Sequence, residues 1–231
     1  MKIGNRKGFS LIEIGIVMVV IGLIIAAVMK GKDVIKGAEV KESTQNYMSK
    51  WINAMDVYYD KLGYNYAGSA SLRAIKEFTT SSAPVRCTDE LNVTTPNSLD
   101  ELFTSAGMNI NQLIKTNTND VCTQTMSGEF TQDAIVGANF AYITVDGQAK
   151  NAIIYTHVPV DVAKTFDKMV DSVIDGTRGR VTFANENSNG EASVLSANTE
   201  KAVLTATTFT SAAWPTVEQE KVVDVVVTLE H

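Results

Sequence analysis

The side chains that most often carry catalysis are scarce in this sequence. Its two histidines are His157 and His231, and no serine or cysteine motif stands beside His157 from which a catalytic triad could be assembled. Neither a glycine-rich phosphate loop nor a dinucleotide-binding fingerprint is present. These residues predict that the protein is not an enzyme.

Cysteine is also rare, and Cys87 and Cys122 are the whole supply. Together with two scattered histidines they do not make a four-ligand zinc site. An even pair of cysteines in an exported protein usually forms a disulfide, whereas in a cytosolic protein it usually stays reduced. If the chain is exported, we therefore expect a Cys87–Cys122 disulfide, which on the chain-entropy model stabilises the fold by about 3–4 kcal/mol.

A carboxylate inside an apolar run is the most unusual chemical feature. The run from Phe9 to Met29, FSLIEIGIVMVVIGLIIAAVM, is about 31 Å long as a helix and matches the hydrocarbon thickness of a bilayer. Glu13 lies within it. A carboxylate in a membrane helix costs on the order of 2.5–3.5 kcal/mol, so a functional role is the default. The alternative is that Glu13 lies near the membrane surface and is merely tolerated.

The eight residues before this run, MKIGNRKG, are basic and end in Gly8. An ordinary secretory signal has its apolar region before the cleavage site, so the order here is inverted. The basic residues Lys2, Arg6 and Lys7 predict that the N-terminus is cytoplasmic and the bulk of the chain lies outside. Without these three the chain has 17 basic and 26 acidic side chains, a net charge of −9, which argues against nucleic-acid binding.

The string Gly8-Phe9-Ser10-Leu11-Ile12-Glu13 resembles the prepilin peptidase site shared by type IV pilins and type II secretion pseudopilins. The resemblance covers about the first 25 to 30 residues. It implies cleavage between Gly8 and Phe9, N-methylation of the new Phe9 amine, and retention of the apolar run as the packed core of a helical filament. Many members of the family carry a proline where this chain has Lys30.

The physical chemistry of Glu13 agrees with that role. After cleavage the Phe9 amine is a cation at the start of a helix, and Glu13 lies four residues further on. A buried, unpaired carboxylate is expensive, so a subunit that joins out of register is penalised. We expect Glu13 to pair with the Phe9 amine of a neighbouring subunit during assembly.

One long helix must position these groups. Apolar residues recur at helical spacing beyond the membrane-length run, for example Val34, Met48, Met55 and Tyr59, and Gly63 is a natural stop. The resemblance implies a leader at residues 1–8 that the peptidase removes. The pattern predicts an apolar helix half at 9–30, an amphipathic half at 31–62, and a globular periplasmic or extracellular domain at 63–231.

The rest of the chain predicts short helices followed by a sheet. Helices are expected at 71–78, 98–106 and 109–115, in the region that contains both cysteines. Strands at 138–145 and 148–158 flank Asp146-Gly147, a two-residue hairpin turn. A helix ending at Gly176 and a final strand at 222–229 complete an α+β layout, a long N-terminal helix packed on a mainly antiparallel sheet. This is the layout that the resemblance implies, the pilin fold.

Acidic side chains provide one candidate ion site. Asp171, Asp175, Glu186 and Glu191 lie near the Asn185–Gly190 loop, where major pseudopilins often carry calcium, and hard oxygen ligands suit this ion. Their spacing matches no defined calcium loop. We expect no cofactor and no metal, with calcium as the alternative.

We expect a structural subunit of a type IV pilus, or fimbrium, that forms a helical homo-oligomer. Its partners are the prepilin peptidase and the inner-membrane assembly machinery. It would reside in the inner membrane before assembly and then in a cell-surface filament for adhesion. The alternatives are a type II secretion pseudopilin and a minor pilin with an adhesive or DNA-binding domain. The chain is long for a pseudopilin body subunit, and its acidic charge disfavours DNA.

Overall fold

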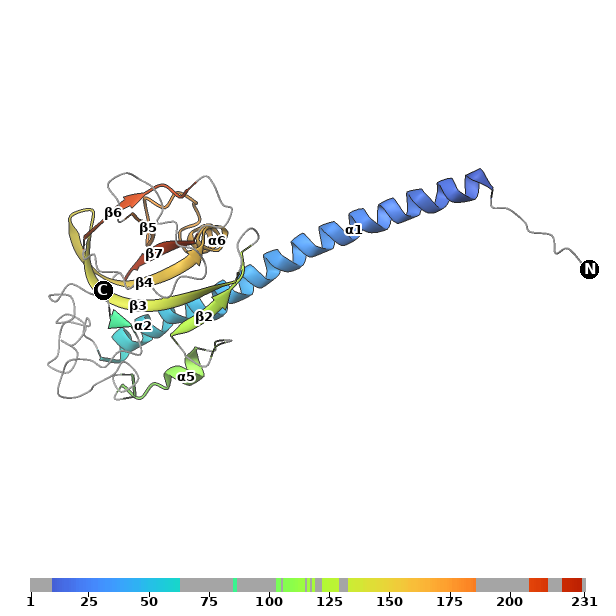
Figure 1. Cartoon of the computed structure of the whole chain (residues 1–231). Coiled ribbons are helices and arrows are strands. Elements are labelled where there is room, and N and C mark those ends of the chain that lie inside the picture. Colours follow the sequence, from blue (N-terminus) through green and yellow to red (C-terminus); the bar gives the residue numbers. More distant parts are fainter. Residues whose placement is uncertain are drawn as a thin grey trace, which may run out of the picture. The chain divides into compact units, whose positions relative to one another are not determined.

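The computed structural model describes residues 10–62, 85–86, 103–104, 106–114, 116, 118, 122–128, 133–185, 208–215 and 222–229. Contacts divide the chain into two compact units, residues 1–39 and residues 40–231. The elements in chain order are α1 (Leu11–Ser43), η1 (Thr44–Met48), α2 (Ser49–Leu62), β1 (Val85–Arg86), α5 (Ile110–Leu113), β2 (Thr123–Met126), β3 (Ala134–Val145), β4 (Gln148–Pro159), α6 (Val160–Asp171), β5 (Val181–Asn185), β6 (Thr208–Ala212) and β7 (Val222–Thr228) (Figure 1).

The long helix predicted between Leu11 and Leu62 is confirmed, but it is not α-helical throughout. The five residues of η1 form a π-helix, in which Ser49 N–H donates to the carbonyl of Thr44, five residues back. The Thr44 hydroxyl donates to the Val40 carbonyl at 2.6 Å, a side-chain bond that competes with the regular helical ladder. The apolar spacing in the sequence predicted one uninterrupted helix over these residues and did not mark the wider turn.

Two tyrosines connect η1 to the sheet. The Tyr155 hydroxyl of β4 donates to the carbonyl of Met48 at 2.7 Å. The hydroxyl of Tyr47, in η1 itself, donates to the carbonyl of Cys122 just before β2. Tyr47, Met48 and Tyr155 are all fully buried. The Tyr155 hydroxyl thus bonds a carbonyl of η1, and the Tyr47 hydroxyl ties η1 to the residue before β2, both where the side chains are buried from water.

The sheet is built on the β3–β4 hairpin. Its two strands pair from Gly137↔Thr156 to Val145↔Gln148, and Asp146 and Gly147 both have positive φ, 49° and 81°. This is the backbone that the Asp-Gly turn predicted. β4 then pairs with β7, β7 with β5, and β5 with β6, all antiparallel. The fold class is therefore α+β with a mainly antiparallel sheet, as predicted.

The strand pairings also form a closed ring, which the sequence did not predict. β6 returns to the far end of β3 in a short parallel contact at Thr144↔Thr208 and Val145↔Phe209. The hairpin tip supports it, because the Asp146 carboxylate accepts bonds from the backbone N–H and the hydroxyl of Ser211, at 3.1 and 2.8 Å. Ring closure hides a strand edge that would otherwise be open to pairing with other chains.

Aromatic side chains join α2, α6 and the sheet in one core. Trp51 of α2 contacts Phe140 of β3 edge to face, with ring centroids 5.0 Å apart. Tyr155 of β4 meets Phe166 of α6 in the same way at 5.9 Å. Each such pair adds about 0.5–1.5 kcal/mol beyond simple burial. Residues Val40–Leu62 therefore belong to the core of the globular unit, whose boundary falls within the long helix.

Helix α6 ends earlier than predicted. Ser172, not Gly176, takes the left-handed conformation that stops it, with φ of 65°. Aspartates on the last turns of α6 bind backbone N–H groups of the following segment and draw the chain out of the helix. The weak helix predicted at 109–115 appears as α5, capped by the side chain of Asn109. The helix predicted at 71–78, and most of the one at 98–106, lie outside the described residues.

Candidate functional site

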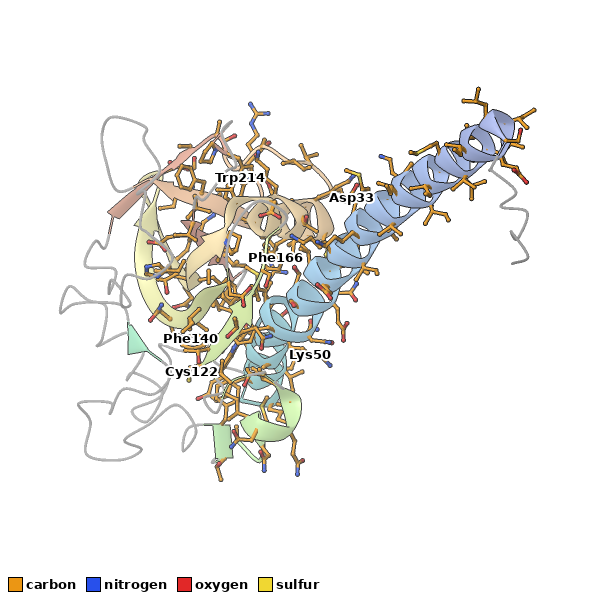
Figure 2. All side chains as sticks on the ribbon, turned by 45° about the vertical axis from the view of Figure 1, so that its right-hand side comes forward. Asp33, Lys50, Cys122, Phe140, Phe166 and Trp214 are labelled. Atoms are coloured by element: carbon orange, nitrogen blue, oxygen red, sulfur yellow. The ribbon has the colours of Figure 1, made fainter. Side chains whose placement is uncertain are left out.

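The N-terminal part of α1 presents apolar side chains on every side. Its large apolar residues between Leu11 and Met29 are 46–91% exposed, and Figure 2 shows them as sticks around the helix. By length and composition the helix could cross a membrane, and none of its most apolar stretch is buried. Gly15 leaves a shallow apolar notch in this surface, lined also by Ile12, Ile16, Val19 and Val20. A surface of this kind needs lipid or protein to cover it.

Glu13 sits in the first turn of α1 and caps the helix. Its carboxylate accepts the backbone N–H of Ser10 at 2.8 Å, while the Ser10 hydroxyl oxygen accepts the N–H of Ile12 at 3.3 Å. This pair resembles a capping box, in which a serine and an acidic residue three positions later satisfy helix-end donors reciprocally. Glu13 is thus a helix cap within its own chain as well as the carboxylate of an apolar surface.

Gly8 and Phe9, the predicted cleavage and methylation positions, lie outside the described residues. The geometry available is therefore that of Ser10 and Glu13 on an otherwise apolar helix. Chemically, the carboxylate can cap the helix or pair with a cation, and it has no second titratable partner among the described residues of the same turn.

Of the two cysteines, Cys122 lies among the described residues and Cys87 does not. Cys122 is buried next to β2 and is disulfide-bonded. Its carbonyl accepts the hydroxyl of Tyr47 and the N–H of Ala138. Cys87 lies outside the described residues, so the Cys87–Cys122 pairing stays a prediction from the sequence.

Three aspartates around the end of α6 organise the segment from 172 to 181. Asp171 accepts the N–H groups of Arg180 and Val181 at 3.0 and 2.8 Å. Asp175 accepts those of Thr177 and Arg178 at 2.8 and 2.9 Å, and these bonds lower its pKa. The two carboxylates that we considered for calcium are thus used by backbone. Glu186 and Glu191 lie outside the described residues, and the described ones contain no cluster of three potential metal ligands.

Asp167 is the deepest of these carboxylates and is fully buried. Its Oδ2 accepts the indole N–H of Trp214 at 2.6 Å and the backbone N–H groups of Asp175 and Gly176 at 3.1 and 3.2 Å. Burial raises the pKa of Asp167, and these three bonds oppose the rise. Gly176, at φ of 71°, is required here because a Cβ would fall 2.8 Å from the carbonyl oxygen of Ala212.

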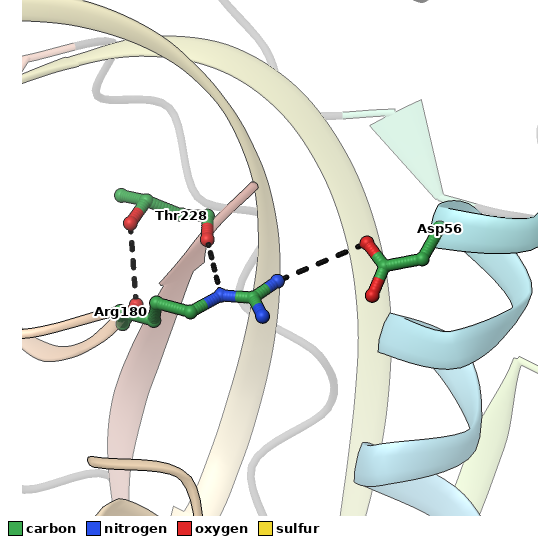
Figure 3. A network of polar contacts seen from close by, with 3 residues as sticks. All are labelled: Asp56, Arg180 and Thr228. Carbon is green, nitrogen blue, oxygen red and sulfur yellow. Dashed lines mark hydrogen bonds and ion pairs between the residues drawn. The ribbon is translucent and has the colours of Figure 1, made fainter. Parts of the chain in front are cut away.

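Arg180 links this segment to α2 and β7 (Figure 3). Its Nη2 lies 3.9 Å from Oδ1 of Asp56, and its Nε donates to the carbonyl of Thr228 at 3.4 Å. The backbone carbonyl of Arg180 in turn accepts the Thr228 N–H at 2.8 Å. Both partners of the ion pair are partly exposed, so it contributes at most about 1 kcal/mol. The arrangement fixes the segment in place and offers no reactive group.

His157 occupies a strained position in β4. Its φ is 60°, and the register of β4 against β7 shifts between Tyr155 and Val158. Its backbone N–H donates to Asp224, but both ring nitrogens are buried without a hydrogen-bond partner. Burial lowers its pKa. The imidazole is therefore part of the interior, with none of the hydrogen bonds that a catalytic histidine requires.

Three features of these sites were not predicted from the sequence. The spacing Ser10-x-x-Glu13 is a capping-box pattern and could have been recognised. Asp167 and Asp171 are four residues apart on α6, and Asp175 follows four residues later beyond its end; this spacing could have indicated a shared role at the helix end. The contacts of Trp214 and Arg180 join segments far apart in sequence, so no local sequence pattern indicates them.

Comparisons with known proteins found no match among protein-family models, curated proteins or solved structures.

Proposed function

We propose that this chain is a structural subunit of a type IV pilus, assembled through its N-terminal helix. In this proposal the prepilin peptidase removes residues 1–8, the Phe9 amine is methylated, and the apolar part of α1 moves from the bilayer into a filament of identical subunits. The globular unit has the pilin fold and lies outside the membrane. Each subunit contributes one helix to the filament core.

The observation that carries the proposal is a long helix with two different environments. From Leu11 to Met29 its apolar side chains are exposed on every side, whereas from Val40 onward it is part of a packed globular core. A helix that only anchored a protein would be served by lipid alone. A helix that must leave lipid needs a second apolar environment, which copies of the same helix supply.

Glu13 explains how such subunits find their register. A carboxylate on this surface costs several kcal/mol in lipid or in a filament core unless it is paired. In the free subunit it caps its own helix through Ser10. In the filament the Phe9 amine of a neighbouring subunit provides a full positive charge for it, so only the correct register avoids an unpaired buried charge.

Mass spectrometry of filaments sheared from the native cell surface tests the proposal. We expect the dominant protein to begin with N-methylated Phe9. If processed protein occurs only in the cell envelope, the chain is a type II secretion pseudopilin or a minor subunit. If the chain keeps Met1 and its leader in purified membranes, the assembly proposal fails.

A control variant sharpens this experiment. Gly8→Arg places a large cation at the predicted cleavage position and should leave the precursor in the membrane with no filaments. The folded globular unit should be unaffected because residue 8 lies outside it. Normal processing of Gly8→Arg would show that cleavage occurs elsewhere.

A further inference from the structure

Three lysines follow the apolar part of α1 directly: Lys30, Lys32 and Lys36. Lys30 and Lys32 are exposed and Lys36 is half-buried. At about 100° per residue, Lys32 and Lys36 lie on one side of the helix and Lys30 on the opposite side. With Asp33, residues 30–36 carry three positive charges and one negative charge, a net charge of +2. The positive charges therefore lie on two sides of the helix, with Asp33 on the side between Lys36 and Lys30.

The length of the apolar stretch places these lysines at a definite depth. From Leu11 to Met29 the helix rises about 28 Å, and the hydrocarbon core of a bilayer is about 27–30 Å thick. When one end of the stretch is at a membrane surface, Lys30 reaches the other surface. Val34 and Ile35, which are 73% and 60% exposed, then lie among the headgroups with the lysines. Lysine suits this layer because its apolar stem stays in lipid while its ammonium reaches the phosphates.

Membrane orientation does not account for these lysines. Basic residues beside a membrane helix collect on the cytoplasmic side, and Lys2, Arg6 and Lys7 at the other flank supply that bias. Three lysines on the outer flank oppose it. Basic residues at a membrane surface are, however, the groups that attract anionic lipids.

We propose that Lys30, Lys32 and Lys36 form a lysine collar that binds the phosphate groups of anionic phospholipids in the outer leaflet of the inner membrane. This inference rests on the membrane-spanning helix of the proposed function. The collar fixes the depth of α1 while the subunit waits for assembly. Cleavage after Gly8 removes the three basic residues of the opposite flank, and the collar is then the main cationic contact between α1 and the bilayer.

Spin-labelled lipids test the collar on the full chain, in which Lys2→Gln/Arg6→Gln/Lys7→Gln removes the basic residues of the leader from every sample. The chain that carries no further change is called unmodified. The protein is placed in phosphatidylcholine vesicles containing a trace of spin-labelled phosphatidylglycerol or spin-labelled phosphatidylcholine. Electron spin resonance then gives two quantities, the fraction of lipid immobilised by the protein and the relative association constant of the two lipids. The variants are Lys30→Gln/Lys32→Gln/Lys36→Gln and the matched control Lys50→Gln/Lys150→Gln/Lys168→Gln, which removes the same charge from the globular unit.

We expect phosphatidylglycerol to associate about threefold or more tightly than phosphatidylcholine with the unmodified chain and with the control variant. The preference should disappear in the collar variant, and it should shrink at about 1 M salt because screening acts over about 3 Å there. Replacing the three lysines by arginine should keep it.

The two readouts separate the possible failures. A collar variant that immobilises lipid and still prefers phosphatidylglycerol overturns the collar, as does an unmodified chain that immobilises lipid without preference, the result expected if the lysines instead contact acidic groups of another copy. If no lipid is immobilised by any variant, α1 does not span the bilayer, and the membrane step of the proposed function fails together with the collar.

Discussion

At the scale of single residues, Glu13 has two roles, and a substitution such as alanine does not separate them. It caps α1 through the Ser10 N–H, and in the proposed filament its charge pairs with an amine. Alanine at position 13 removes both. Glutamine keeps a side-chain oxygen that can accept the Ser10 N–H, since glutamine also serves in capping boxes, but it carries no charge.

We therefore predict that Glu13→Ala and Glu13→Gln are both processed normally at Gly8 and both assemble few filaments. The comparison is made by counting sheared filaments and by measuring the mass of the membrane-bound subunit. If Glu13→Gln forms normal filaments while Glu13→Ala does not, the helix cap is the essential task and charge pairing is excluded.

His157 gives stability a pH dependence whose sign follows from its burial. Its pKa in the folded state is below its ordinary value of 6.5, so the unfolded chain binds the proton more readily between the two values. The free energy of unfolding then decreases as the pH is lowered through 6.5. The raised folded-state pKa of Asp167 acts in the opposite direction, with stability lost as the pH rises above 3.8 toward that raised value.

Substituting His157 by asparagine, which tolerates a positive φ, isolates the contribution of the imidazole. We predict that the difference in unfolding free energy between the original chain and His157→Asn becomes less favourable to the original chain as the pH falls from 7 to 5. Urea unfolding at several pH values measures it. A difference that does not change with pH would mean that the ring is solvated, contrary to its burial.

At the scale of elements, the segment after α6 is held by aspartates more than by apolar packing. Asp167 joins α6 to Trp214, which follows β6, and to the backbone of the segment itself. A buried carboxylate is stabilising only while its donors are present. Of the three hydrogen bonds that Asp167 accepts, the one from the indole N–H of Trp214 is the shortest, at 2.6 Å.

We predict that Trp214→Phe lowers the free energy of unfolding by about 1–3 kcal/mol at neutral pH, because one bond to a buried carboxylate is lost while the aromatic ring beside Phe183 is retained. Since the bond favours the charged form of Asp167, the loss should be smaller at acid pH. In an Asp167→Asn background the same substitution should cost less. Equal costs in both backgrounds would show that Trp214 stabilises the fold by packing alone.

How far the sequence predicted these elements depends on how local their causes are. The β3–β4 hairpin follows from Asp146-Gly147, two adjacent residues suited to positive φ, and the start of α6 follows from its apolar spacing. The end of α6 was placed too late because the carboxylates of Asp167 and Asp171 bind backbone several residues ahead. The contact of β6 with β3 joins residues more than sixty positions apart, and no local pattern encodes it.

The residues of the candidate sites also differ in how local the causes of their roles are. Glu13 could be selected from the sequence because a lone carboxylate in an apolar run is expensive wherever the chain folds. Its bond to Ser10 was also encoded locally, in the spacing of the two residues. By contrast, the burial of His157 and of Asp167 depends on how distant strands meet. The sequence singled out His157 without its surroundings, and it did not single out Asp167.

At the scale of the whole molecule, the chain combines two parts with opposite requirements. The globular unit from residue 40 onward buries its own apolar core, whereas the apolar surface of α1 is exposed. The exposed apolar surface of α1 should therefore be the only part of the chain that requires detergent. The net charge of −9 outside the leader favours solubility of the globular unit.

We predict that a fragment of residues 40–231, kept under oxidising conditions, is monomeric without detergent, while the full chain requires detergent or lipid. Size-exclusion chromatography with light scattering measures both, and circular dichroism of the fragment checks that it is folded. A fragment that aggregates would mean that the first part of α1 also shields apolar surface of the globular unit.

The π-helix η1 has a consequence for the azimuth of α1. A π-turn holds one residue more than the α-turn it replaces, and one residue corresponds to about 100° of rotation about the helix axis. A helical wheel drawn through Leu11–Leu62 as one α-helix therefore assigns wrong faces to everything before Thr44. By the same geometry, a one-residue deletion in η1 would move Val40 out of register with the core that Tyr47 and Met48 share with α2.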